Sequence, residues 1–249
     1  LFSIIACATL YLAFFFDGMQ QVIPANESES GLPELISIPT NGAREAFTVL
    51  LVLQGFFLMF LGTGRVASVT AEEKEAGLLD YQRMTPMNPF SKILGYLFGL
   101  PAREYFMFLI TLPFLLHCMV VGKIPLLNLF QLYAVFFCSV ILYHLTAHVI
   151  GLVVPKPRAA SWVARLAVLG LYVFLPVLGQ AGISFLSFLT ILPTYFGKIV
   201  PHLLAEGTNI LGPFERQVVA FWQEIPFFTY QISPSTFTFV MQGLILLAL

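Results

Sequence analysis

Residues 46–64 read AFTVLLVLQGFFLMFLGTG, an apolar run without a charged side chain. A transmembrane helix needs roughly 20 such residues. Lipid offers backbone amides no hydrogen-bond partner, so the run must be helical. Similar runs lie near residues 1–16, 105–121, 124–154, 166–196 and 236–249, and none alternates like a β-barrel strand. The sequence therefore predicts an all-α, polytopic membrane helix bundle of about six transmembrane helices, in a single domain over residues 1–249.

The composition supports this fold class. Hydrophobic residues make up 58% of the chain and charged residues 10%, whereas about a quarter of the residues in a soluble domain are charged. The net charge of −1 disfavours a nucleic-acid-binding protein, which needs a basic face. Cys7, Cys118 and Cys138 all lie in apolar runs without metal-site spacing. We therefore expect buried thiols rather than a disulfide or a metal site.

The distribution of Lys and Arg predicts the orientation, because cytoplasmic loops of membrane proteins are enriched in both. Eight lie in or beside the loops after the second and fourth runs, namely Arg65, Lys74, Arg83, Lys92, Arg103, Lys156, Arg158 and Arg165. Four lie on the opposite side, namely Arg44, Lys123, Lys198 and Arg216. We expect a multi-pass integral protein of the plasma (inner) membrane, with residues 65–104 and both chain ends in the cytoplasm.

The outer side is predicted to hold two long loops, 17–45 and 198–235, and a short turn near Gly122–Lys123. The second loop is typical of short re-entrant or interfacial helices. Within it, residues 213–223 favour an amphipathic helix at the membrane surface, with a plain loop as the alternative.

The fifth apolar run, 166–196, is too long for one straight membrane helix. Pro176, Gly179 and Gly182 lie inside it and predict a kink or a break. We favour a plain structural kink, and a binding site formed by a broken helix is the alternative.

Residues 72–95, EEKEAGLLDYQRMTPMNPFSKILG, form a charged segment between the second and third apolar runs. Thr70 and Glu73 have the spacing of a capping box, and the helix dipole favours acidic residues in the first turns. The helix should end before Pro86, because a residue that precedes proline avoids the α region. The pattern therefore predicts a short acidic helix over residues 72–84.

A second short helix is expected to follow, with Asn88 as its cap and Pro89 at its first position. Pro101 should end it or start the next helix. The two short helices would meet at Thr85–Pro86 and either lie on lipid headgroups or dock a soluble partner. Anionic headgroups attract basic helices, whereas the first helix is acidic, so we favour docking.

The segment resembles the sequence after the second transmembrane helix of type-2 ATP-binding-cassette (ABC) export permeases. That pattern runs E-x-E-x-G-T-L-E, a few apolar residues, T-P and I-x-x-G-K. The matching residues here are Glu73, Glu75, Gly77, Leu79 and Asp80, then Met84-Thr85-Pro86 and Ile93-x-Gly95. Leu78, Asp80 and Tyr96 depart from the usual Thr, Glu and Lys. The predicted helix number and the long last outer loop also agree, so the resemblance covers most of the chain.

The resemblance implies the transmembrane permease half of an ATP-driven exporter. Residues 72–84 would be a coupling helix that seats in a groove of a separate cytoplasmic ABC ATPase subunit. Its docking residues would be Glu72, Glu73, Glu75, Gly77, Leu78, Leu79, Asp80, Met84, Thr85 and Pro86. It also implies a second permease half, identical or homologous. The possible cargo path or dimer interface comprises Phe56, Phe57, Phe60 and Pro176.

The chain has no GxxxxGK[ST] phosphate-binding loop, so it cannot bind ATP in that manner. No nucleophile–base arrangement stands out among its Ser, Tyr and His residues either, and we expect no catalytic site, cofactor or metal in the chain. ATP and Mg would be bound by the partner ATPase. Acidic residues are scarce in the apolar runs, which disfavours an ion-coupled carrier and favours an apolar or amphiphilic cargo. The alternative is a non-transporting membrane-anchoring or scaffold subunit of a larger complex.

His144 and His148 lie four residues apart and therefore on one face of the fourth predicted helix. This spacing can bind haem or a metal, but no matching ligand pair stands out in another apolar run. We expect polar packing between helices. A cargo or gate role, and a metal or haem site in a membrane enzyme, are the alternatives.

Overall fold

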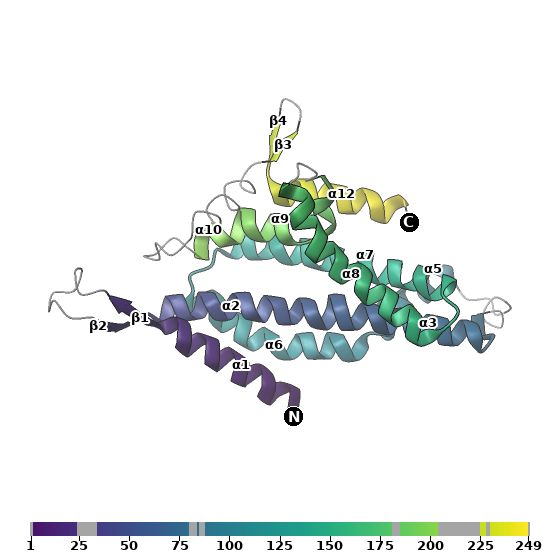
Figure 1. Ribbon diagram of the computed structural model, residues 1–249, viewed down its shortest axis with the longest axis horizontal. Coiled ribbons are helices and arrows are strands. Elements are labelled where there is room, and N and C mark those ends of the chain that lie inside the picture. The colour runs from purple at the N-terminus through teal and green to yellow at the C-terminus, as the bar shows by residue number, and fades with distance from the viewer. Residues whose placement is uncertain are drawn as a thin grey trace.

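The computed structural model describes residues 2–23, 34–79, 84, 88–180, 185–203, 225–227 and 230–248. It is a helix bundle with two short antiparallel hairpins (Figure 1). The main helices are α1 (Phe2–Met19), α2 (Pro39–Gly55), α3 (Thr63–Glu75), α6 (Ala102–Val121), α7 (Leu126–Val153), α8 (Pro157–Gln180) and α12 (Pro234–Ala248). The hairpins pair β1 (Gln20–Ile23) with β2 (Glu34–Ser37), and β3 (Ile225–Phe227) with β4 (Tyr230–Ile232). The all-α fold class is confirmed.

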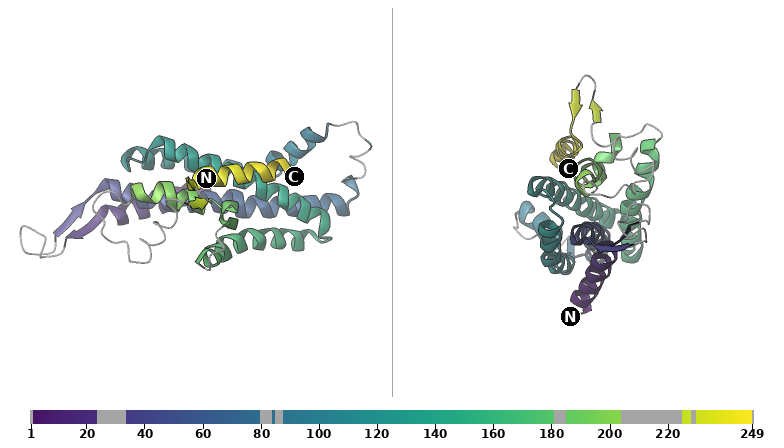
Figure 2. Two further views of the ribbon diagram at one scale, coloured as in Figure 1. Left: turned by 90° about the horizontal axis from the view of Figure 1, so that it is seen from above. Right: turned by 90° about the vertical axis from the view of Figure 1, so that its left-hand side faces the viewer.

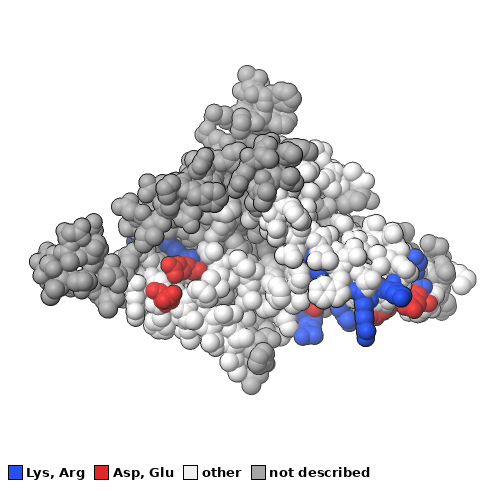
Figure 3. All heavy atoms as spheres, in the orientation of Figure 1, with Lys and Arg blue, Asp and Glu red and all other residues white. Residues whose placement is uncertain are grey.

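The elongated bundle has two distinct ends (Figures 1 and 2). We call the end with the β1–β2 hairpin and the Gly122–Lys123 turn the hairpin end. The opposite end, with the last turns of α3 and with α5 (Pro89–Leu94), is the tip end. Charged side chains gather toward these two ends, and the described residues between them show no charged side chain in the view of Figure 3. Such a distribution is typical of a bundle that spans a membrane.

One helix runs without interruption from Pro39 to Glu75, through α2, a π-helical stretch η1 (Phe56–Gly62) and α3. Its 37 residues make it about 55 Å long at 1.5 Å per residue, which exceeds the roughly 30 Å hydrocarbon core. The capping box expected at Thr70 is wrong, because Thr70 lies buried inside this helix. The helix continues past Gly64 because its next turns pack against α7 and α8, through Val66, Ala67, Thr70 and Ala71.

Four helices are long and apolar enough to cross a membrane, namely Pro39–Glu75, Ala102–Val121, Leu126–Val153 and Pro157–Leu175. They correspond to the second to fifth predicted runs and indicate a multi-pass integral membrane protein. The first and last predicted runs form shorter apolar helices, Ile4–Met19 and Ser235–Ala248. Four of the six expected membrane helices therefore reach full length among the described residues.

The side chains are distributed as in a membrane protein, because many apolar groups lie on the outside and several polar groups lie within the apolar core. Phe130 and Val153 are each 72% exposed, whereas Gln54 and Gln242 are fully buried. Gln54 donates from Nε2 to Thr111 Oγ1 at 2.7 Å and accepts from Tyr133. These polar contacts join neighbouring helices, as expected where lipid cannot supply partners.

The fifth run begins and ends differently from the prediction. Helix α8 starts at Pro157, nine residues before the expected Leu166, because the Pro157 end packs beside α3. It is described as far as Gln180 and includes Pro176 and Gly179, so neither residue breaks the helix. Gly182, the third residue of the predicted kink or break, lies outside the described residues. Short helical pieces follow: η3 (Phe185–Leu189), α9 (Leu192–Thr194), η4 (Tyr195–Ile199) and α10 (Val200–Leu203). The amphipathic helix expected over 213–223 lies outside the described residues.

A buried arginine fastens the hairpin end. Arg44, near the start of α2, is 6% exposed. Its Nε donates to Gly122 O at 3.1 Å and its Nη1 to Leu203 O at 3.4 Å. Arg44 thus joins the start of the long helix to the short α6–α7 turn, which agrees with the sequence prediction, and to the end of α10.

Helices α3, α7 and α8 approach closely because small residues line their contact, namely Ala67, Ala71, Ala147, Ala160 and Ala164. At Gly151 of α7, a Cβ atom would lie 2.6 Å from Ala67 O and 2.7 Å from Thr70 Cβ. Only glycine therefore fits at this crossing. Close approach through small residues is a common way for membrane helices to associate.

Gly151→Ala should destabilise the protein, because the added methyl group meets a backbone carbonyl that cannot move alone. We expect a loss of about 1–3 kcal/mol, as for overpacked cores, measured as a lower thermal transition in detergent. Gly243→Ala in α12 is the matched control, since nothing lies within 4 Å of a Cβ there. Equal stability of the two variants would contradict the proposed close contact.

Candidate functional site at the tip end

The long helix ends in a glycine turn. Ala76 N donates to Glu72 O at 2.9 Å, Gly77 N donates to Lys74 O at 3.1 Å, and Gly77 has φ +71°. This left-handed conformation favours glycine and is a common helix end. The expected continuous helix over 72–84 is therefore wrong, because Gly77 separates Glu72–Glu75 from the helical residues Leu78 and Leu79.

The second short helix agrees with the prediction. Phe90 N donates to Asn88 Oδ1 at 3.0 Å, and Pro89 occupies the first position of α5. A π-helical stretch, η2 (Gly95–Gly99), continues α5, and Pro101 precedes α6. The segment buries Tyr96 and Leu97 and exposes the apolar side chains of Phe90, Ile93, Leu94 and Phe98.

An internal polar cluster fastens this segment to the long helix and to α7. Tyr96 donates its hydroxyl to the Glu73 carboxylate, and its ring lies 4.5 Å from that of His148, measured between centroids. Thr70 Oγ1 and His148 Nδ1 are 3.0 Å apart. We call Thr70, Glu73, Tyr96 and His148 the tip cluster. Sequence reasoning missed Tyr96, which stands out only as a departure from the usual Lys.

A lysine makes a second connection to α7. Lys74 Nζ donates to Leu152 O at 2.6 Å, in the last turn of α7, whose carbonyls are free to accept. Two consecutive side chains therefore hold the end of the long helix. Glu73 accepts from Tyr96, and Lys74 donates to α7.

The predicted docking residues differ in exposure. Glu72, Glu75, Gly77 and Leu78 are exposed and together form what we call the acidic tip. Glu73 and Leu79 are half-buried, and Met84 is 79% exposed. The remaining three predicted residues, Asp80, Thr85 and Pro86, lie outside the described residues. The structure thus brings the acidic tip together at the end of the long helix, whereas Glu73 is turned toward Tyr96.

The predicted aromatic site lies elsewhere, on η1 in the middle of the long helix. Phe56 is 46% exposed and stacks on Phe60, with ring centroids 5.4 Å apart. Phe57 is half-buried. Pro176 lies in α8, and its side chain is outside the described residues. Val52, Phe56 and Phe60 lie four residues apart on the long helix and therefore form one ridge. Val52 is 68% exposed.

The two histidines have the contacts of polar helix packing. His144 is 1% exposed, and its Nε2 donates to Leu58 O at 3.0 Å. His148 belongs to the tip cluster. Among the described residues, no group of three or more His, Cys, Asp or Glu side chains could hold a metal ion.

A search of protein-family models, curated proteins and solved structures found no match for this chain.

Tyr96→Phe should loosen α5 and η2, because it removes the hydroxyl that binds Glu73. A hydrogen bond to a charged group contributes about 1.5–3 kcal/mol, so amide exchange over residues 89–99 should accelerate by about tenfold or more. Glu75→Gln, on the exposed acidic tip, is the control and should leave exchange unchanged. Unaltered exchange in Tyr96→Phe would show that the tip cluster does not hold the segment.

Proposed function

We propose that this chain is the transmembrane permease half of an ATP-driven exporter, with an apolar or amphiphilic cargo. A separate ATPase subunit would bind the acidic tip. The observation that carries the proposal is the uninterrupted helix Pro39–Glu75, which ends in that tip. The sequence pattern around Glu73, Glu75 and Gly77 supports the same interpretation through its resemblance to type-2 ABC export permeases.

The long helix can act as a lever. A force on Glu72 or Glu75 would reach α7 through Lys74 and His148, and the segment before α6 through Tyr96. The helix also packs along α1, α6, α7 and α8. Movement of the tip would therefore shift helices as rigid bodies, which is a common form of conformational coupling.

The acidic tip suits a protein partner better than a lipid surface. Glu72 and Glu75 are exposed carboxylates, which anionic headgroups would repel. Leu78, 48% exposed beside them, adds an apolar contact. A basic groove with an apolar floor would complement this surface.

The ridge of Val52, Phe56 and Phe60 is the proposed contact with a second permease half. Its aromatic side chains are anchors of the kind enriched at interfaces. An export path would then lie between two copies of the long helix.

Glu75→Lys should abolish binding of the ATPase subunit, because it reverses an exposed charge without touching the tip cluster. The measurement is co-purification of a P-loop subunit with the full-length protein in mild detergent. Glu45→Lys, an exposed glutamate near the other end of the same helix, is the matched control and should retain the subunit. Equal retention by both variants would count against the docking site.

Cargo should stimulate ATP hydrolysis by the co-purified complex in lipid vesicles. An ATPase subunit that binds but never responds to any amphiphilic cargo would instead favour the anchoring-subunit alternative.

Val52→Cys should cross-link two copies under mild oxidation, in a background with Cys7, Cys118 and Cys138 changed to Ala. Leu109→Cys on α6, 55% exposed, is the control and should remain monomeric on non-reducing gels. The reverse pattern would place the dimer interface on α6.

A further inference from the structure

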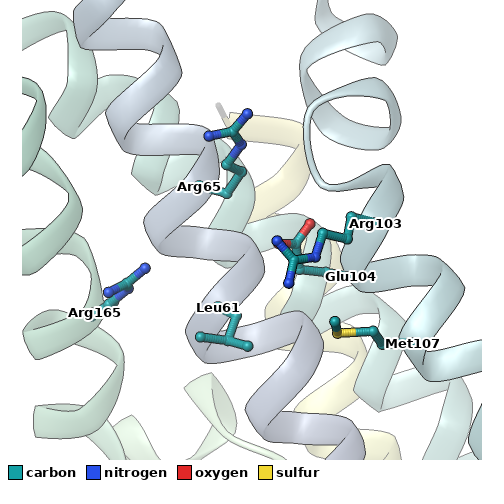
Figure 4. Close-up of a pocket in the computed structure, with 6 residues that line it drawn as sticks. All are labelled: Leu61, Arg65, Arg103, Glu104, Met107 and Arg165. Carbon is teal, nitrogen blue, oxygen red and sulfur yellow. The ribbon is translucent and has the colours of Figure 1, made fainter. Parts of the chain in front are cut away.

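A cavity with four charged residues in its lining opens between the long helix, α6 and α8 near the tip end (Figure 4). Its volume is about 230 Å³, far above the roughly 10–15 Å³ that one water needs. Six residues line it: Leu61, Arg65, Arg103, Glu104, Met107 and Arg165. The predicted docking residues and the aromatic ridge contribute no lining side chain.

The lining carries three guanidinium groups and one carboxylate, which give it a formal charge of +2. Glu104 is 8% exposed. Within the described part of the chain, its Oε2 has no hydrogen-bond partner, and the same holds for Arg165 Nε. Buried polar atoms are nearly always paired, so the Glu104 carboxylate beside the cavity still lacks a donor.

The position of Arg165 is fixed by its surroundings. Its guanidinium carbon lies 5.7 Å from the Phe60 ring centroid and 5.8 Å from that of Trp162. Its side chain also crosses Gly64, where a Cβ atom would come within 2.2 Å of Nε. Stacked arginine is well suited to phosphate, because its planar group donates two parallel hydrogen bonds.

Arg103 and Glu104 lie in the first turn of α6. Glu104 alone does not neutralise three arginines, so the electrostatics favour an anionic ligand that also offers a donor to the carboxylate.

We propose that this cavity binds the headgroup of a membrane phospholipid that carries an ammonium beyond its phosphate. The phosphate contacts Arg65, Arg103 and Arg165, and the ammonium donates to Glu104. Acyl chains continue along the apolar surface of α8, where Trp162 and Leu166 are 59% and 57% exposed. Basic pockets between membrane helices are known lipid sites. This inference does not depend on the export function.

The experiment is a titration of the purified full-length protein in neutral detergent. The probes are dioctanoyl phosphatidylethanolamine, inorganic phosphate and dioctanoylglycerol, followed by native mass spectrometry and calorimetry. The phosphatidylethanolamine should saturate one site, and the uncharged dioctanoylglycerol should not. Arg103→Gln, at an exposed position, and Arg165→Gln should each weaken phosphatidylethanolamine binding by about tenfold or more.

Arg158→Gln is the matched control, because Arg158 is an exposed arginine of α8 that does not line the cavity. It should leave the affinity unchanged. Glu104→Gln should weaken the binding of phosphatidylethanolamine, because it removes the partner of the ammonium. It should strengthen the binding of inorganic phosphate, because it removes a repulsive charge.

Equal affinity for phosphatidylethanolamine and inorganic phosphate would overturn the lipid assignment in favour of a free phosphate ion. Equal losses of phosphatidylethanolamine affinity in Arg103→Gln and Arg158→Gln would overturn the site itself, and so would saturable binding of dioctanoylglycerol. A folding defect in Arg165→Gln leaves the test intact, because Arg103→Gln and Glu104→Gln address the same cavity.

Discussion

The close approach of α7 to the long helix is the contact on which the tip end depends. Gly151 lets the Ala67 carbonyl approach α7 more closely than any other residue would allow. One turn earlier, the same approach brings His148 within hydrogen-bonding distance of Thr70. Tyr96 then packs over His148 and binds Glu73. The position of the acidic tip thus depends on the close helix contact that Gly151 allows, although Gly151 has no side chain of its own.

The main features of the fold follow from the sequence, because membrane helices are long and lipid restricts them to one secondary structure. The turn at Gly122–Lys123 and the Asn88–Pro89 helix start are also local, so their residues predict them. In the candidate site, too, some features follow from local sequence and others from contacts between distant residues. Exposure of Glu72 and Glu75 agrees with their charge, whereas the direction of Glu73 depends on Tyr96, 23 residues further along the chain.

The capping-box error at Thr70 has a physical cause. The local pattern of Thr70 and Glu73 favours a helix start in water, but tertiary packing decides the outcome. Thr70 is buried against α7, and a helix start there would break backbone hydrogen bonds inside the bundle. The cavity beside α6 was not predictable, since its lining residues come from three separate helices and no sequence motif connects them.

The contacts of Arg44 constrain the order in which the protein assembles. The carbonyl partners of Arg44 lie 78 and 159 residues further along the chain. A buried charge is costly until its partners arrive. During biosynthesis the start of the long helix therefore reaches its final contacts only after α10 has emerged. Chains that stop before residue 203 leave the Arg44 contact with Leu203 unmade.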